Sequence, residues 1–248
     1  MPFRIGRWMC VGGFLLTFAV GISQERQNYA DFWLASNIRM KIGMHWSVSN
    51  EIHIRRTHFL KHWEQFIVRP SVRYQLSEQL NFSLGYSYIR TYPFSENMKP
   101  FPIQENNIWE QILIQHKIER VQFKHRIRFE QRFTEHFDED SLHQFTRDGV
   151  NFSNRIRYRI ILKVPFAKQF FFKTFDEIMI RMNSKFQNMT YDRNWVYAGF
   201  GWSFSKQSSL NLGYLFQFIK VNPNLIQLHH TLVIGIQYTF QILKSQKN

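Results

Sequence analysis

The stretch from His125 to Phe133, which reads HRIRFEQRF, decides the fold. Charged side chains stand at alternate positions, namely Arg126, Arg128, Glu130 and Arg132, and mostly apolar residues stand between them. Successive side chains of a β-strand point to opposite faces, so one face of this strand is charged and the other is apolar. In a soluble sheet the apolar face would be covered by a core and the charged face by water. The rest of the chain must supply that cover.

The rest of the chain supplies more strands and no helix. Roughly ten further segments alternate in the same way, which predicts an all-β chain. Lipid can cover the apolar faces if the sheet closes into a transmembrane antiparallel β-barrel, with an apolar exterior and an arginine-rich lumen. The expected strands lie near residues 31–41, 46–57, 63–75, 80–91, 108–117, 121–133, 151–163, 170–182, 193–204, 210–218 and 228–240.

These segments predict a barrel of 10–12 strands, with about 11 counted. A single-chain bacterial barrel has an even number of strands, so we expect either 10 or 12. Longer loops are expected at 92–105, 134–150 and 183–192, and short turns at the opposite end of the barrel.

The N-terminal residues 1–23 have the pattern of a secretory signal. Arg4 and Arg7 precede an apolar run over 8–22, and small residues stand near Ser23. A membrane helix would need about 20 apolar residues. We therefore expect cleavage after Ser23, which leaves one barrel domain over 24–248 and removes Cys10, the single cysteine.

The chain is strongly basic. Removal of Arg4 and Arg7 from the 32 basic residues leaves 30 against 18 acidic residues, a net charge of about +12. Nucleic acid, anionic lipid and anionic solutes are partners for such a charge. A nucleic-acid binder carries its aromatic and basic side chains on one face. Here they alternate between faces, so no nucleic acid is expected.

The C-terminal strand carries Gly235, Tyr238 and Phe240. This glycine and two alternate aromatic residues resemble the signal by which outer-membrane barrels are recognised for insertion. The expected location is therefore the bacterial outer membrane, as an integral protein. The expected partners are outer-membrane lipid, lipopolysaccharide and the barrel-assembly machinery. No role is assigned to the tail Gln241–Asn248.

Several of these features together resemble the DUF2490 family, a group of barrel proteins frequent in Bacteroidetes-type bacteria. The resemblance covers nearly all of residues 24–248 and departs at Trp195, where the family pattern leads us to expect an arginine. It implies an outer-membrane barrel and no known activity. The features are the run Arg126 to Arg132, the alternate arginines 155, 157 and 159, Glu177, the pair Tyr191-Asp192 and Gly199.

The inward arginines have two interpretations. Guanidinium groups bind carboxylate, sulfate or phosphate in pairs of hydrogen bonds, so the lumen would pass or bind small anionic solutes, such as acidic sugars. Alternatively, the arginines pack against carboxylates and hold a closed structural barrel. The residues expected to attract anions are Arg55, Arg69, Arg73, Arg126, Arg128, Arg132, Arg155, Arg157 and Arg159, and the expected acidic partners are Glu51, Glu130 and Glu177.

Counting charges favours the first interpretation. About 13 basic groups, Arg39, Lys124, Lys173 and Arg181 among them, face inward against about three or four carboxylates, and buried unpaired charges are costly. The surplus should therefore meet water or a bound anion.

Catalysis is not expected. A lipopolysaccharide-modifying enzyme is a weaker alternative, for which His53 with Glu51 is the nearest pair of a base and an orienting carboxylate. Such a pair would have to lie near the loop rim. The adjacent His229 and His230 would point to opposite faces of a strand, so no metal site and no cofactor are predicted.

The two arginine-rich strands should pair with each other in a definite register. Strand 121–133 faces inward at even positions and strand 151–163 at odd positions, so the numbers of opposed residues add up to an odd sum. A sum near 285 places Glu130 opposite Arg155. We therefore expect Glu130 to accept a hydrogen bond from a neighbouring arginine.

Overall fold

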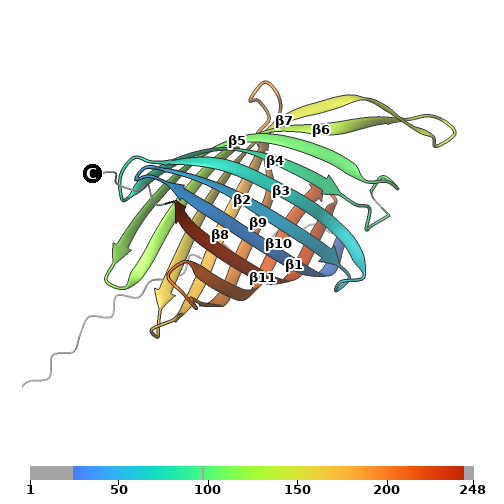
Figure 1. Cartoon of the computed structure of the whole chain (residues 1–248). Coiled ribbons are helices and arrows are strands. Elements are labelled where there is room, and N and C mark those ends of the chain that lie inside the picture. The colour runs from blue at the N-terminus through green and yellow to red at the C-terminus, as the bar shows by residue number, and fades with distance from the viewer. Residues whose placement is uncertain (1–24, 97, 243–248) are drawn as a thin grey trace, which may run out of the picture.

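A computed structural model of the chain, described over residues 25–96 and 98–242, is a closed barrel of eleven β-strands (Figure 1). The all-β prediction is confirmed. No helix in these two ranges is long and apolar enough to cross a membrane. The strands are β1 (Glu25–Ile42), β2 (Trp46–Thr57), β3 (His62–Gln75), β4 (Leu80–Thr91), β5 (Ile103–Ile118), β6 (Val121–Glu139), β7 (Phe145–Pro165), β8 (Phe170–Met182), β9 (Thr190–Trp202), β10 (Ser208–Asn222) and β11 (Leu225–Ile242).

The barrel closes through a parallel pair. β1 and β11 run side by side in the same direction, from Glu25↔Leu225 to Ile42↔Ile242, while all other neighbouring strands are antiparallel. The expectation of an even strand number is therefore wrong. A parallel ladder satisfies the backbone groups of two edge strands as an antiparallel one does, so closure does not require an even count.

The alternation of side chains follows the predicted faces. Exposed large apolar side chains occur on all eleven strands, with Ile38 on β1, Leu84 on β4 and Ile236 on β11 as examples. On β5, Trp109 and Leu113 are buried inside the barrel and Ile112 is exposed. The exterior is thus apolar, and charged and aromatic side chains fill the interior.

The two ends of the barrel differ. At the end named here the short-turn end, the connections are residues 43–45, 76–79, 119–120, 166–169 and 203–207. At the opposite end, named the loop end, the longest connection joins Thr91 to Ile103. β11 finishes at the short-turn end beside β1, as Figure 1 shows at the left.

The loop predicted over 134–150 is wrong, because most of it is strand. β6 continues to Glu139 and β7 begins at Phe145, so the two form a long hairpin that projects beyond the barrel (Figure 1). β5 pairs with β6 only as far as Thr134, and β8 pairs with β7 only from Asn154 onward. Residues beyond these limits lack a second neighbouring strand, which explains why the sequence there lacks an apolar alternation.

A pair of cysteines tests the parallel closure. Leu34 and Ile234 are directly opposed across the β1–β11 seam, so we expect Leu34→Cys with Ile234→Cys to form a disulfide on mild oxidation. The chain also carries Cys10→Ser. The readout is a mobility shift of the folded protein on a non-reducing gel.

The control pair is Leu34→Cys with Ile236→Cys. A shift of two residues adds about 6.6 Å along the strand, which puts the two Cβ atoms beyond the reach of a disulfide. Equal cross-linking of both pairs would contradict the register of the seam.

Candidate lumen site

Two carboxylates organise the interior, Glu130 on β6 and Glu177 on β8. They are buried, with exposed fractions of 1% and 0%. Arg157 on β7 bridges them, because its Nη1 donates to Glu130 at 2.8 Å while its Nε and Nη2 donate to Glu177 at 2.9 and 3.0 Å. Arg155 also donates to Glu130, at 2.7 Å. The predicted bond between Glu130 and a neighbouring arginine is thus confirmed.

The predicted register between β6 and β7 is confirmed as well. It places two arginine pairs directly opposite each other, and like charges in such positions repel. Glu177 relieves one pair, because it accepts hydrogen bonds from Arg126 and, at 2.9 Å, from Arg159 Nε. The anion that these arginines hold is therefore a carboxylate of the chain itself. The opposed pairs are Glu130 with Arg155, Arg128 with Arg157 and Arg126 with Arg159.

Two of the buried acidic residues that sequence reasoning did not place in the lumen extend this network toward the loop end. Glu105 on β5 accepts bonds at 2.9 and 2.5 Å from Arg132. Asp192 on β9 is 1% exposed and accepts bonds from Arg155 at 3.3 Å and Arg181 at 2.7 Å. Both acids lie two residues inside the start of their strands, where the sequence pattern had suggested a loop.

Aromatic rings hold the arginines that have fewer carboxylate partners. The Arg128 guanidinium lies 3.9 Å above the Trp109 ring and donates to Gln111 at 2.8 and 3.1 Å. Gly85 on β4 makes room for this tryptophan, since a Cβ at Gly85 would come within 2.2 Å of the Trp109 ring. Small inward residues on β4 thus allow an arginine and a tryptophan to stack inside the barrel.

Trp195 occupies the position where the family pattern led us to expect an arginine. It packs against Trp33, with ring centroids 5.3 Å apart, and faces the guanidiniums of Arg55 and Arg157 at 5.6 and 5.4 Å. Arg55 lies closer to Trp33, at 3.7 Å, and donates to Gln65. The π-face of the Trp195 indole therefore attracts these two guanidinium groups, whereas an arginine at the same position would repel them.

The predicted acidic residue Glu51 lies on β2, in a more open part of the lumen. Arg69 donates to it at 3.3 Å and also to Ser87 at 2.9 Å. His53 Nε2 lies 3.4 Å from Glu51. His53 and Glu51 line a cavity within the barrel, whereas the enzyme alternative needs such a pair near the loop rim.

Five lumen cations have no ion pair and no side-chain hydrogen bond among the described residues. Each lies two or three residues from the short-turn end of its strand, and together they are named the basic vestibule. No lumen-facing carboxylate of the described chain lies as close to that end. Lys163 and Lys173 are directly opposed on β7 and β8. Lys124 is repelled by the positive charges of Arg39, Arg73 and Lys163. The five are Arg39, Arg73, Lys124, Lys163 and Lys173.

A cavity of about 200 Å³ lies inside the barrel, and Lys173 of the vestibule lines it. Lys173, Arg126 and Arg159 line it on the basic side, and Phe175 and Tyr197 supply aromatic walls. This volume is far above the roughly 10–15 Å³ that one water needs. The cavity therefore has room for water or for a small anion in contact with cationic and aromatic groups.

The lumen is thus divided along its axis. Around Glu130 and Glu177 and toward the loop end, arginines are packed against carboxylates of other strands that neutralise most of their charge. The short-turn half holds cations without carboxylates. Of the nine arginines expected to attract anions, Arg73 is the one that lies in the basic vestibule, and the anion-attracting role of all nine stays a prediction.

The residues of the expected insertion signal lie on β11. Tyr238 and Phe240 are 48% and 37% exposed, with ring centroids 6.0 Å apart, and both lie on the outer surface at the short-turn end. Their role in insertion stays a prediction. The expected signal segment 1–23 and residues 243–248 of the tail lie outside the described residues.

Comparison with known proteins identifies the family and little more. A family model described as "Protein of unknown function (DUF2490)" matches residues 30–228. No curated protein matches the chain. Among solved structures, the chain is similar to one described as "NanC porin structure in rhombohedral crystal form". That similarity has 12% identity and a TM-score of 0.44, and it covers 84% of this chain and 99% of the porin chain. A TM-score of this size carries no conclusion about what the chain does.

The network makes a prediction about stability. Glu130→Ala should lower the free energy of unfolding by about 3–5 kcal/mol, because it leaves Arg155 and Arg157 buried with a partner missing. Urea unfolding of the barrel in detergent or lipid vesicles measures the change.

The matched control is Glu139→Ala, which removes a carboxylate from the exposed hairpin tip. An exposed substitution of this kind should change stability by no more than about 0.5 kcal/mol. Equal losses for the two variants would show that Glu130 does not hold the network together.

Proposed function

Since the chain belongs to the DUF2490 family, whose description gives no function, we propose a function from the lumen itself. The protein is an integral barrel of a bacterial outer membrane that admits small anionic solutes into the basic vestibule and passes them slowly through the lumen. It reaches that membrane after secretion and removal of residues 1–23. The unpaired cations of the basic vestibule carry the proposal.

The exterior supports residence in a membrane. A soluble monomer seldom exposes a contiguous apolar patch above a few hundred Å², whereas here apolar side chains are exposed on every strand. Aromatic residues also gather near the short-turn end, where Trp46 contacts Tyr74 and Phe170 contacts Trp202. Such aromatic girdles stand at the membrane–water interfaces of outer-membrane barrels. The proposed partners of this surface are outer-membrane lipid and lipopolysaccharide, with the barrel-assembly machinery during insertion.

The vestibule supports the sign of the solute. Ammonium and guanidinium groups in a pore favour anions. Lys163 and Lys173 face each other with no carboxylate between them, so an anion or water must screen their repulsion. Phe171 lies beneath Lys163, with the ammonium 3.6 Å from its ring centroid. A small organic acid with an apolar or sugar face would match both the charges and the rings.

The packed half of the lumen limits passage. Glu177, Glu130 and Arg128 have exposed fractions of 0–2%, so a solute must displace parts of the arginine–glutamate network to cross. These same burials favour a second candidate function, a closed structural barrel whose lumen conducts nothing. The two candidates differ in a measurable current.

Conductance across a planar lipid bilayer in a KCl gradient decides between them. We expect small currents whose reversal potential lies toward the chloride equilibrium potential, because the vestibule concentrates anions. The double variant Lys124→Glu with Lys173→Glu should lose most of this selectivity. The control Lys185→Glu changes an exposed charge outside the vestibule and should keep it.

Cation preference in the unaltered protein would contradict the proposal. An absence of current from protein shown to be folded by its heat-modifiable gel mobility would overturn passage and support the closed structural barrel.

A further inference from the structure

The projecting hairpin carries a group of side chains that the lumen does not use. It consists of residues 135–139 of β6 and 145–150 of β7, which pair only with each other. One face of the hairpin is covered by the connection after β4, because Phe101 packs on Phe137 and Phe145 with centroids 4.6 and 5.2 Å apart. His136 and Asp138 occupy alternate positions to Phe137 and therefore the other face.

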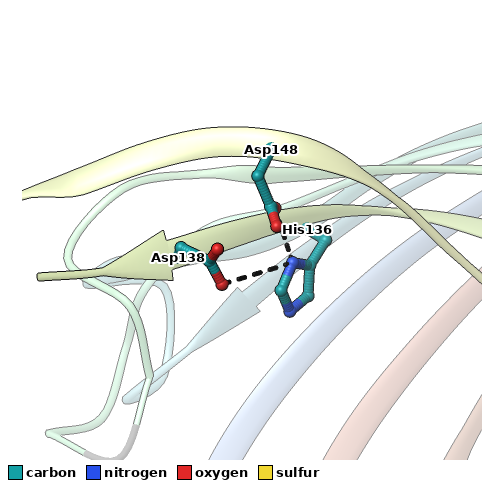
Figure 2. Close-up of side chains that lie close together, drawn as sticks. All are labelled: His136, Asp138 and Asp148. Atoms are coloured by element: carbon teal, nitrogen blue, oxygen red, sulfur yellow. Dashed lines mark hydrogen bonds and ion pairs between the residues drawn. The ribbon is translucent and has the colours of Figure 1, made fainter.

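A β-bulge adds a third side chain to that face. His136 pairs with Gly149 and Phe137 pairs with Arg147, so Asp148 is an extra residue without a partner position on β6. Bulges re-aim side chains and occur at functional sites. Here the bulge brings the carboxylate of Asp148 beside the imidazole of His136, as Figure 2 shows.

Both carboxylates approach the same ring nitrogen. His136 Nδ1 lies 2.6 Å from Asp148 Oδ1 and 3.9 Å from Asp138 Oδ1, and the three groups offer ligand atoms within 4.8 Å of one another (Figure 2). Nδ1 donates its hydrogen to Asp148, because an ionised carboxylate can only accept. This bond is the main cause that holds the pKa of Asp148 below its ordinary value.

The charge around these groups suits a cation. Five acidic residues lie between positions 135 and 148, against the single basic residue Arg147, in a chain whose net charge is +14. Arg147 is already paired with Glu135 at 3.4 Å. The face that bears His136, Asp138 and Asp148 is therefore locally negative, in contrast to the basic vestibule at the opposite end of the barrel.

We propose that His136, Asp138 and Asp148 bind a divalent transition-metal ion through one imidazole nitrogen and one oxygen from each carboxylate. Imidazole with carboxylates suits borderline ions such as Zn²⁺. Bonds of about 2.0–2.2 Å in a tetrahedral site place its ligand atoms about 3.3 Å apart. The distances of 2.6 and 3.9 Å bracket that value, and all three ligand atoms lie within 4.8 Å of one another, so small side-chain rotations complete the three-ligand side.

Metal binding would have two consequences. The ion binds the neutral imidazole through Nδ1, with the ring hydrogen on Nε2, so binding competes with protonation of the ligands and the affinity falls as the pH is lowered. It also ties β6 to β7 in a part of the hairpin that has no other strand beside it. The fourth position faces solvent, since Asp138 and His136 are 70% and 38% exposed, and water or an external oxygen ligand can take it.

Titration calorimetry of the full chain in detergent with ZnCl₂ tests the site. We expect one equivalent of Zn²⁺ to bind, and to bind more weakly when the titration is repeated at lower pH, because protonation competes with the metal for its ligands. His136→Ala and Asp148→Asn should each weaken this binding at least tenfold. All variants should keep the heat-modifiable gel mobility of a folded barrel, because the substituted residues lie in the hairpin that projects beyond the barrel.

The matched control is His143→Ala. His143 lies at the tip of the same hairpin, and its imidazole lies 2.6 Å from Glu139, so its loss should leave the affinity unchanged. Equal binding by His136→Ala and the unaltered chain would overturn the site. So would an equal loss in the control, which would indicate scattered surface histidines. The test does not depend on conductance, so it stands apart from the proposed function.

Discussion

The interior depends on carboxylates that several arginines share. Glu177 accepts hydrogen bonds from three arginines on β6 and β7. Glu130 accepts hydrogen bonds from Arg155 and from Arg157, which it shares with Glu177. A buried guanidinium is costly without a partner, and a carboxylate on the next strand can serve it only in one register. A shift of the pairing register by one residue would turn every side chain of the strand to the opposite face. The network therefore fixes the register of β6, β7 and β8 and closes the middle of the lumen.

The same constraint explains the difference between the two ends. Arginine occupies the packed half, where its planar fork bonds two oxygens at once and stacks on indole rings. Lysine is confined to the short-turn half of the lumen, where Lys124, Lys163 and Lys173 find no carboxylate. A lysine ammonium is strongly hydrated, so it suits a wet vestibule better than a packed layer. Arg39 and Arg73 share the vestibule with these lysines, so arginine occurs in both halves of the described lumen and lysine only in the basic half.

Much of the fold could be predicted from the sequence. Alternation alone identified the strands and their faces, and parity fixed the odd sum that pairs Glu130 with Arg155. The closure could not be predicted, because no local pattern states whether β1 meets β11 in parallel. The projecting hairpin was missed for a similar reason, since strands without a covered face need not alternate. Glu105 and Asp192 were missed because they stand at strand starts beside polar loops.

The proposed metal site on the hairpin could also be predicted from the sequence only in part. His136 and Asp138 are visible as an alternate pair in the sequence, but Asp148 joins them only through a bulge. Sequence reasoning likewise overestimated the surplus of lumen cations, because it placed too few carboxylates inside. Both errors arise from single residues whose side-chain direction depends on pairing, not on local alternation.

The lumen is divided into a half whose arginines are neutralised by carboxylates and a half whose cations have no carboxylate partner. Arginine modification by phenylglyoxal in the folded barrel, followed by peptide mass spectrometry, measures this division residue by residue. The account predicts rapid modification of Arg39 and Arg73 in the basic vestibule and slow modification of Arg128, Arg155 and Arg157 in the network. Equal rates for the two groups would contradict it.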